Sequence, residues 1–363
     1  MKHNGLLQSL LKSFPAPDFL TMPAVGMELT LRGVRFLELK DKAGGYSIGR
    51  YGESFLPKPL EDETFPSSEA LKTLLAEVKQ KYNFGFVEAA LPEEKAYIFS
   101  TEVPQLSPEE IHASLELQLE EHVPVPPGEA VFDYQIINTD EATKKYLVSV
   151  SVLPHLIVSR YLDFFTSVGL QPISFQLSAQ AVTNSVVSFG NDAPLILVNM
   201  GERQTGLYLV SHRTVHFTST VAVGGEAFTE AIKKYFSVSE AEAEKIKTER
   251  GILKKKEESE LFFSLANTLS VLKDEVEKLV SYWQTHLERY SNVRQKITRV
   301  VLCGSESGLQ GLPEYLEANL SMPVELGNVW RNVFSFDSYI PPISRKDSLA
   351  YATATGLLLR RHD

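Results

Sequence analysis

Residues 25–39 read VGMELTLRGVRFLEL and have the pattern of two strands joined by a turn. Apolar and polar side chains alternate along residues 25–29 and again along 34–39, on either side of a turn at Arg32 and Gly33. Alternation with a period of two residues is typical of a half-buried strand. Two such runs joined by a glycine-containing turn predict a β-hairpin at the start of the fold.

The second half of the chain repeats this opening. We expect a continuous apolar strand over residues 195–200, interrupted only by Asn199, and then strands over 206–210 and 214–223 after a short turn. A hairpin-led β-meander is therefore predicted twice, once around Glu28 and once around Asn199. Hairpins are common, so the repeat is only weak support for a duplicated architecture.

Between the two meanders lies a segment with its own pattern, residues 87–172. Strands are expected near its start, and Ser107 and Glu110 form a capping box that opens a helix closed by Pro124. An alternating strand follows over 148–152, and then a second helix before Gly169. The order strand, helix, strand, helix predicts an inserted α+β subdomain.

A long apolar stripe follows the second meander, from Leu261 to Leu287. Its members are spaced by three, four or seven residues, and the stripe is widened by aromatic side chains such as Trp283. A coiled-coil seam would be narrower, with two apolar positions in seven. The width therefore favours a helix packed against its own sheet, before a buried strand over residues 299–303.

Composition restricts the class of protein. The chain has 363 residues, 43% of them hydrophobic, which indicates a folded protein of several subdomains. The 36 Lys and Arg against 46 Asp and Glu give a net charge of −10, which argues against nucleic acid as a partner. A single cysteine, Cys303, fits a reducing compartment, and no apolar run has the length of a membrane span.

Glycine-rich turns at the ends of strands are the candidate sites for chemistry. Such turns occur at residues 28–33, 199–205 and 304–308, and Gly224 and Gly225 stand before a predicted helix. Exposed backbone N–H groups and a helix dipole bind phosphate, and a nearby carboxylate can hold its Mg²⁺. Taken singly, each of these turns is more often a plain structural turn.

Together, the turns resemble those of the actin-like ATPase fold, and in particular those of the PilM family of type IV pilus assembly proteins. Residues 25–39 are similar to the first phosphate motif of that family, and 104–126 to part of its inserted subdomain. Residues 224–229 and 243–247 resemble its nucleotide-facing helices, and 309–324 its adenosine loop with the following helix. The resemblance extends over residues 23–359.

The resemblance implies an α/β fold with two lobes and four subdomains. We expect a first actin-like subdomain, an inserted α+β subdomain that binds a partner, a second-lobe sheet subdomain and a small helical subdomain. Their expected ranges are, in that order, 23–86 with 173–190 and 340–363; 87–172; 191–223 with 260–339; and 224–259.

The same resemblance implies a nucleotide site at Glu28, Thr30, Arg35, Asn199, Gly201, Thr205, Gly224, Gly225, Glu226, Glu244, Lys247, Gly304, Ser305 and Glu306.

Several positions depart from the family pattern. Glu28 and Thr30 replace an Asp and a Gly, and the β-branched Thr30 stands where backbone should approach phosphate closely. Asn199 replaces an Asp and removes a charge that would support Mg²⁺. Glu306 replaces a glycine and would repel phosphate. We therefore expect a degenerate site with no catalytic residues, no metal, and weak or absent binding of ATP with Mg²⁺.

Other candidate chemistry is weaker. His212 and His216 are four residues apart, but on a strand they do not share a helical face, and tetrahedral zinc needs further ligands. Gly304 to Gly308 has the glycine spacing of a nucleophile elbow, with Glu306 at its centre in place of serine. We expect no metal site and no hydrolase site at these positions.

The family resemblance implies a cytoplasmic scaffold, peripheral to the inner membrane, in a type IV pilus or related assembly machine. Its implied partner is the cytoplasmic N-terminal tail of a bitopic, PilN-like membrane protein, held between the inserted and first subdomains, with an assembly motor ATPase as a second partner. Membrane association is expected through partners, or through the short amphipathic stretch 6–14. The alternatives are an active ATPase that uses Glu28 for Mg-ATP, and an actin-like component of a type II secretion or cell-division complex.

Overall fold

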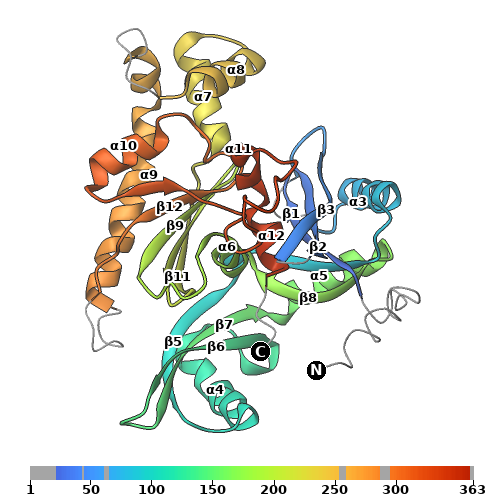
Figure 1. Cartoon of the computed structure of the whole chain (residues 1–363), viewed down its shortest axis with the longest axis vertical. Coiled ribbons are helices and arrows are strands. Elements are labelled where there is room, and N and C mark those ends of the chain that lie inside the picture. Colours follow the sequence, from blue (N-terminus) through green and yellow to red (C-terminus); the bar gives the residue numbers. More distant parts are fainter. Residues whose placement is uncertain (1–21, 43–44, 61–64, 253–258, 287–294, 360–363) are drawn as a thin grey trace.

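The computed structural model of the chain describes residues 22–42, 45–60, 65–252, 259–286 and 295–359. The stretch 6–14 and Leu287 lie outside the described residues, and the side chain of Leu261 is likewise not described. Figure 1 shows two larger sheets with their helices and a smaller sheet below them. We call the parts built on the two larger sheets the first and second lobes.

The first lobe is built on a five-stranded sheet in the order β3-β2-β1-β4-β8. The predicted hairpin is confirmed: β1 (Ala24–Thr30) and β2 (Gly33–Lys42) are antiparallel, and β3 (Gly45–Phe55) continues the meander. The parallel strands β4 (Phe86–Leu91) and β8 (Gln171–Leu177) complete the sheet beside β1.

Helices cover both faces of this sheet. On one face, α3 (Glu69–Tyr82) and α5 (His155–Ser167) bury Leu71, Leu75 and Phe165 against it. On the other face, α12 (Ala352–Leu357) approaches β1 and contacts α6 (Ser178–Val186). The backbones of these two helices are in direct contact at Gly356. A Cβ added there would lie 1.6 Å from the carbonyl oxygen of Ala181, so only glycine fits.

The second lobe has the same strand arrangement, in the order β11-β10-β9-β12-β13. The second predicted meander is confirmed as β9 (Leu195–Met200), β10 (Thr205–Ser211) and β11 (Thr214–Val221), all antiparallel. The strands β12 (Val300–Cys303) and β13 (Val324–Leu326) are parallel to β9. Each lobe is thus an antiparallel meander extended by two parallel strands.

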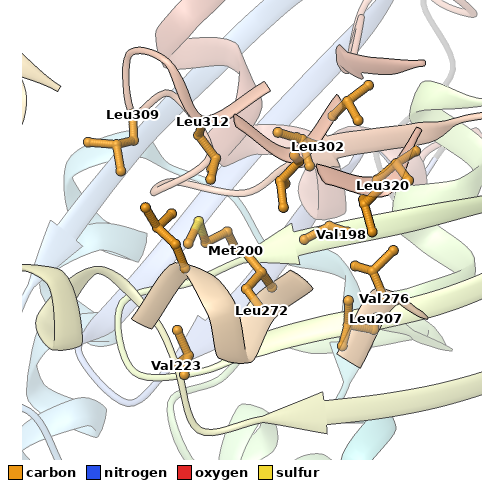
Figure 2. Close-up of a cluster of buried hydrophobic side chains, with 14 of the residues drawn as sticks. Val198, Met200, Leu207, Val223, Leu272, Val276, Leu302, Leu309, Leu312 and Leu320 are labelled. Atoms are coloured by element: carbon orange, nitrogen blue, oxygen red, sulfur yellow. The ribbon is translucent and has the colours of Figure 1, made fainter. Parts of the chain in front are cut away.

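The long helix α9 (Ser259–His286) packs on this second sheet, as its wide apolar stripe predicts. Figure 2 shows Leu272 and Val276 from α9 among Val198, Leu207 and other core side chains of the lobe. Both Leu272 and Val276 are fully buried. Within the described residues, the stripe is therefore core surface and not a coiled-coil seam.

Three further helices complete the second lobe. Helix α10 (Leu312–Leu320) lies beside α9, while α7 (Gly225–Phe236) and α8 (Glu240–Arg250) pair with each other at the top of Figure 1. Helix α8 begins at the predicted capping box, in which Ser239 and Glu242 exchange hydrogen bonds. Two short helices, α11 (Arg345–Ser348) and η5 (Leu349–Tyr351), lead into α12. Leu349 and Ala350 of η5 line a cavity between the lobes.

The smaller sheet has the order β5-β7-β6. It contains β5 (Tyr97–Pro104), β6 (Ala130–Asp140) and β7 (Lys145–Pro154), with η3 (Pro127–Glu129) before β6. Helix α4 (Pro108–His122) begins at the predicted capping box and covers one face. We call this unit, residues 97–154, the inserted subdomain.

The inserted subdomain is narrower than the segment 87–172 that its sequence pattern suggested. Strand β4 at the start of that segment belongs to the first sheet, and α5 near its end packs on the same sheet. The chain leaves the first sheet through the short helix η2 (Glu93–Lys95) and returns to it through α5 and β8.

The inserted subdomain also contacts the second lobe through β11. The hydroxyl of Ser149 donates to the carbonyl oxygen of Val215 at 2.9 Å, and Ser100 Oγ lies 3.4 Å from His216 Nδ1. The ring of His216 also lies against Trp283, and burial lowers the pKa of its imidazole to about 4. His216 is therefore neutral at physiological pH and sits in this interface, while His212 bonds Ser211 in the preceding turn.

Candidate functional site

The two meanders place their first turns on opposite sides of a cavity of about 490 Å³ between the lobes. The β1–β2 turn forms one wall and the β9–β10 turn forms another. Helices η2 and α5 contribute the side chains of Glu93 and Tyr161. Duplicated strand topology thus creates a site at the ends of the strands, where polar turn residues from both halves meet.

The β1–β2 turn is closed by the hydroxyl of Thr30. Its Oγ1 accepts hydrogen bonds from the backbone N–H groups of Arg32, at 3.3 Å, and Gly33, at 3.2 Å. These amides are the kind of donors that a phosphate would need in such a turn. The sequence predicted that the size of the Thr30 side chain would keep the backbone away from a phosphate. In the structure, its hydroxyl also accepts the hydrogen bonds of these two amides.

Glu28 stands on β1 opposite Arg35 on β2 and faces the cavity. One carboxylate oxygen accepts a hydrogen bond from Thr353 Oγ1 at 2.9 Å, and the other lies 3.5 Å from Arg35 Nη1. Arg35 also donates to Glu53 at 3.2 Å, so its positive charge is shared between the carboxylates of Glu28 and Glu53. Burial raises the pKa of Glu28, although Arg35 and Thr353 act in the opposite direction.

Asn199 takes part in a hydrogen-bonded chain that crosses between the lobes. Its Nδ2 donates to Tyr208 Oη at 3.2 Å, and Tyr208 donates to Glu93 Oε1 at 2.5 Å. Burial, together with the neighbouring Glu94, raises the pKa of Glu93 to about 7. Glu93 and Tyr208 carry no local sequence signal, because both are brought together only by the tertiary fold.

The start of α7 is bonded to the β9–β10 turn. The N–H of Gly225 donates to the Gly201 carbonyl at 3.0 Å, and the N–H of Glu226 donates to the Glu202 carbonyl at 2.8 Å. A Cβ at Gly224 would lie 2.4 Å from that second carbonyl oxygen. Two donors at this helix N-terminus are therefore used within the protein, and Gly224 is required for the close approach.

Lys247 forms a buried ion-pair cluster with two carboxylates. Its Nζ lies 2.9 Å from an oxygen of Glu244 and 2.9 Å from one of Glu306, and its side chain is 7% exposed. Burial opposes the charge on Lys247, but the two carboxylates outweigh it and raise the pKa of the ammonium. We expected Glu306 to present a free negative charge; instead it is neutralised by Lys247.

Glu306 also fills the space above the start of α7. A Cβ placed on Gly225 would lie 2.2 Å from the carboxyl carbon of Glu306, so the side chain rests directly on this glycine. The loop that carries Glu306 is held by its backbone, since the N–H of Glu306 donates to the Met200 carbonyl at 3.0 Å. Gly304 has φ +93, and a Cβ there would meet the same carbonyl at 2.4 Å.

The structure divides the predicted site residues into two groups. The first group lines the cavity between the lobes: Glu28, Thr30, Arg35, Asn199, Gly201, Gly304 and Ser305. The second group lies outside the lining, at the start of α7, in the Lys247 cluster and on β10: Thr205, Gly224, Gly225, Glu226, Glu244, Lys247 and Glu306. Thr205 is buried, and its hydroxyl donates to the Val223 carbonyl.

Two lobes built on related sheets, with a cavity between their first turns, define an actin-like protein. Solved structures share this architecture. The chain is similar to MreB5 of Spiroplasma citri bound to ADP, with a TM-score of 0.55, 12% identity, and coverage of 91% of this chain and 94% of that one. It is also similar to a structure described as the PilM-PilN type IV pilus biogenesis complex, with a TM-score of 0.76, 19% identity, and coverage of 93% and 98%.

The sequence identifies the family. The family described as type IV pilus assembly protein PilM matches residues 26–362. The chain therefore belongs to the PilM family of type IV pilus assembly proteins. Among the described residues, no helix has both the length and the apolar character that a membrane crossing requires.

Proposed function

We propose that this protein is a cytoplasmic scaffold of a type IV pilus assembly machine. In this role it binds the cytoplasmic N-terminal tail of a PilN-like inner-membrane partner and has weakened or lost ATP binding. Family membership supports the place in pilus assembly. A similar fold in a PilM-PilN complex supports the kind of partner. The same scaffold would offer a second surface to an assembly motor ATPase.

One observation supports weakened or lost nucleotide binding: side chains of the protein itself occupy the positions that the family resemblance assigns to the nucleotide. On one side of the cavity, the hydroxyl of Thr30 accepts the hydrogen bonds of the amides of the β1–β2 turn. On the other side, Glu306 covers Gly225 and is paired with Lys247 at 2.9 Å. To enter this space, ATP would have to separate Glu306 from Lys247, and breaking a largely buried ion pair is costly.

The residues that would hold Mg²⁺ are also engaged by other groups of the protein. Glu28 is a hard oxygen ligand of the kind that Mg²⁺ prefers, but its carboxylate is already bonded to Thr353 and Arg35. Asn199 supplies no charge, and its amide nitrogen is directed to Tyr208. An ATPase that used Glu28 would therefore have to break both arrangements before it could bind Mg-ATP.

Binding of the tail is tested by calorimetry. The full chain is titrated with a synthetic peptide of the partner's N-terminal cytoplasmic segment, and a peptide with the same composition in scrambled order serves as the control. We expect saturable binding of the native peptide only. Equal binding of both peptides, or no binding of either, would contradict the scaffold role.

A further inference from the structure

The cavity between the lobes extends beyond the turns that were predicted to contact a nucleotide. Among the described residues, its lining includes neither the predicted residues of α7 and α8 nor Glu306. The lining continues along the first lobe instead, from the end of β3 to η2 and α5. A volume of about 490 Å³ is that of a small-molecule site, and this space is offset from the positions expected for adenosine.

The first-lobe side of the cavity is apolar. We use the name apolar wall for the lining residues Leu31, Phe55, Phe65, Pro66, Ile157 and Tyr161. The ring of Tyr161 meets that of Phe65 edge-on, with 6.0 Å between the ring centroids. Phe55 is 42% exposed, so part of this wall is left uncovered. Sites for small molecules have such walls with a few orienting polar groups, so we expect a ligand with an apolar body.

One polar group of the apolar wall stands without a partner in the described part of the chain. Tyr161 is 4% exposed, and its hydroxyl makes no hydrogen bond to another described residue. Burial, together with Glu94 and Glu93, raises the pKa of this phenol, so it keeps its proton. Leaving a buried hydroxyl unpaired costs free energy, which an acceptor on a ligand would recover. The apolar wall therefore offers a hydrogen-bond donor to a ligand.

The charges around the cavity favour an anionic ligand. Each lining carboxylate is already bonded within the protein: Glu28 to Arg35, Glu93 to Tyr208, Glu94 to Gln204 and Glu202 to Arg32. Two lining cations differ from these carboxylates. Lys95 on η2 and Arg160 on α5 are exposed and form no ion pair with another described residue. An arginine in this position can bind a carboxylate through two parallel hydrogen bonds.

We propose that this cavity binds a small organic acid, with its apolar body on the apolar wall and its carboxylate at Arg160, Lys95 and the hydroxyl of Tyr161. A single negative charge is favoured over a phosphate, because Glu93 and Glu94 act on Tyr161 and would repel a group with more charge. This site goes beyond the proposed function, since it adds a small ligand to a scaffold and requires neither a nucleotide nor a membrane partner.

The test uses the full chain and the probe anilinonaphthalene sulfonate, which has an aromatic body and one negative charge and fluoresces more strongly in an apolar site. Octanoate is then added to displace the probe, with octanol as the uncharged control of the same length. Octanoate should displace the probe at a concentration about tenfold lower than octanol does, because only octanoate pairs with Arg160. Equal displacement by the two compounds, or equally effective displacement by Mg-ATP, would overturn the inference.

Protein variants place the ligand at the apolar wall, and thermal melting checks that each stays folded. Arg160→Gln should weaken octanoate binding about tenfold. Arg250→Gln is the matched control, since Arg250 is exposed on α8 and lies outside the lining, and it should change binding little. Tyr161→Phe removes only the hydroxyl and should weaken octanoate binding about fivefold, with a smaller effect on octanol. Equal octanoate binding by the two arginine variants, or equal losses of octanoate and octanol in Tyr161→Phe, would overturn the inference and leave the scaffold role standing.

Discussion

Glu93 and Tyr208 join the two lobes through a hydrogen bond of 2.5 Å between the phenol and the carboxylate. Glu93 lies on η2, where the chain leaves the first sheet, and Tyr208 lies on a central strand of the second. The amide of Asn199 donates to the same phenol. Asn199 thus does more than remove a charge: an aspartate there would be a second acceptor facing a phenol that has one proton to donate.

This contact predicts that stability depends on pH. The pKa of Glu93 is raised from 4.5 to about 7 in the folded protein, so the folded state holds a proton that the unfolded state has released between these values. Stability from this group should therefore be highest below pH 4.5 and fall as the pH rises to 7, by about 3 kcal/mol in all.

Urea unfolding at several pH values measures this dependence, with Glu93→Gln for comparison. The amide cannot lose a proton, so the variant should lack this part of the decline between pH 5 and pH 8. The neighbouring carboxyls Glu28 and Glu202 also have raised pKa values and stay in both proteins, which isolates the contribution of Glu93. Parallel curves for the two proteins would contradict the prediction.

Local patterns predicted the elements well. The alternation in residues 25–39, the capping boxes at Ser107 and Ser239, and the wide stripe of α9 each depend on neighbours within a few residues. Such signals are present in the sequence itself. They indicated two meanders, a helix against the second sheet, and an α+β insertion.

Long-range contacts could not be predicted in this way. A short apolar run such as β4 fits a strand in the insertion as well as one in the first sheet, and only its pairing with β1 decides. Glu93 and Tyr208 are separated by 115 positions, so neither indicates the other. Similarly, the sequence shows a carboxylate at Glu306 and an ammonium at Lys247, but not that the fold pairs them.

The packing of α9 predicts that one buried position is essential. Leu272 is fully buried among side chains of the second sheet, as Figure 2 shows. Replacing it with Asp would bury a charge without a partner and should cost more than about 4 kcal/mol, enough to unfold the protein. Circular dichroism and thermal melting measure the loss. Val271→Asp is the matched control, since Val271 is 42% exposed, and it should stay folded.

The contact between α6 and α12 predicts a strict requirement for glycine. A Cβ at Gly356 would lie 1.6 Å from the carbonyl oxygen of Ala181, so Gly356→Ala must push the two helices apart. Overpacking of this kind costs about 2 kcal/mol or more. Gly85→Ala is the control, because nothing lies within 4 Å of a Cβ there. Chemical denaturation should show a lowered midpoint for the first variant only, and equal midpoints would argue against the close contact.

If the family resemblance assigns the nucleotide positions correctly, removing the side chains that occupy them should improve ATP binding. Glu306→Gly would free the space over Gly225, and Thr30→Gly would release the amides of Arg32 and Gly33. The double variant should bind fluorescent ATP with Mg²⁺ more tightly than the natural chain, whose binding should be weak or absent. Lys247 would keep its ion pair with Glu244, and the side of its ammonium that Glu306 occupies would become available for a phosphate.

The control is Glu240→Gly combined with Thr30→Gly, which removes an exposed carboxylate at the start of α8 in place of Glu306. Fluorescence titration is run beside a phosphate-release assay, and folding is checked by thermal melting. We expect neither variant to hydrolyse ATP, since Asn199 still supplies no charge for the metal. Micromolar, magnesium-dependent binding with steady turnover by the natural chain, lost in Glu28→Ala, would instead identify an active ATPase.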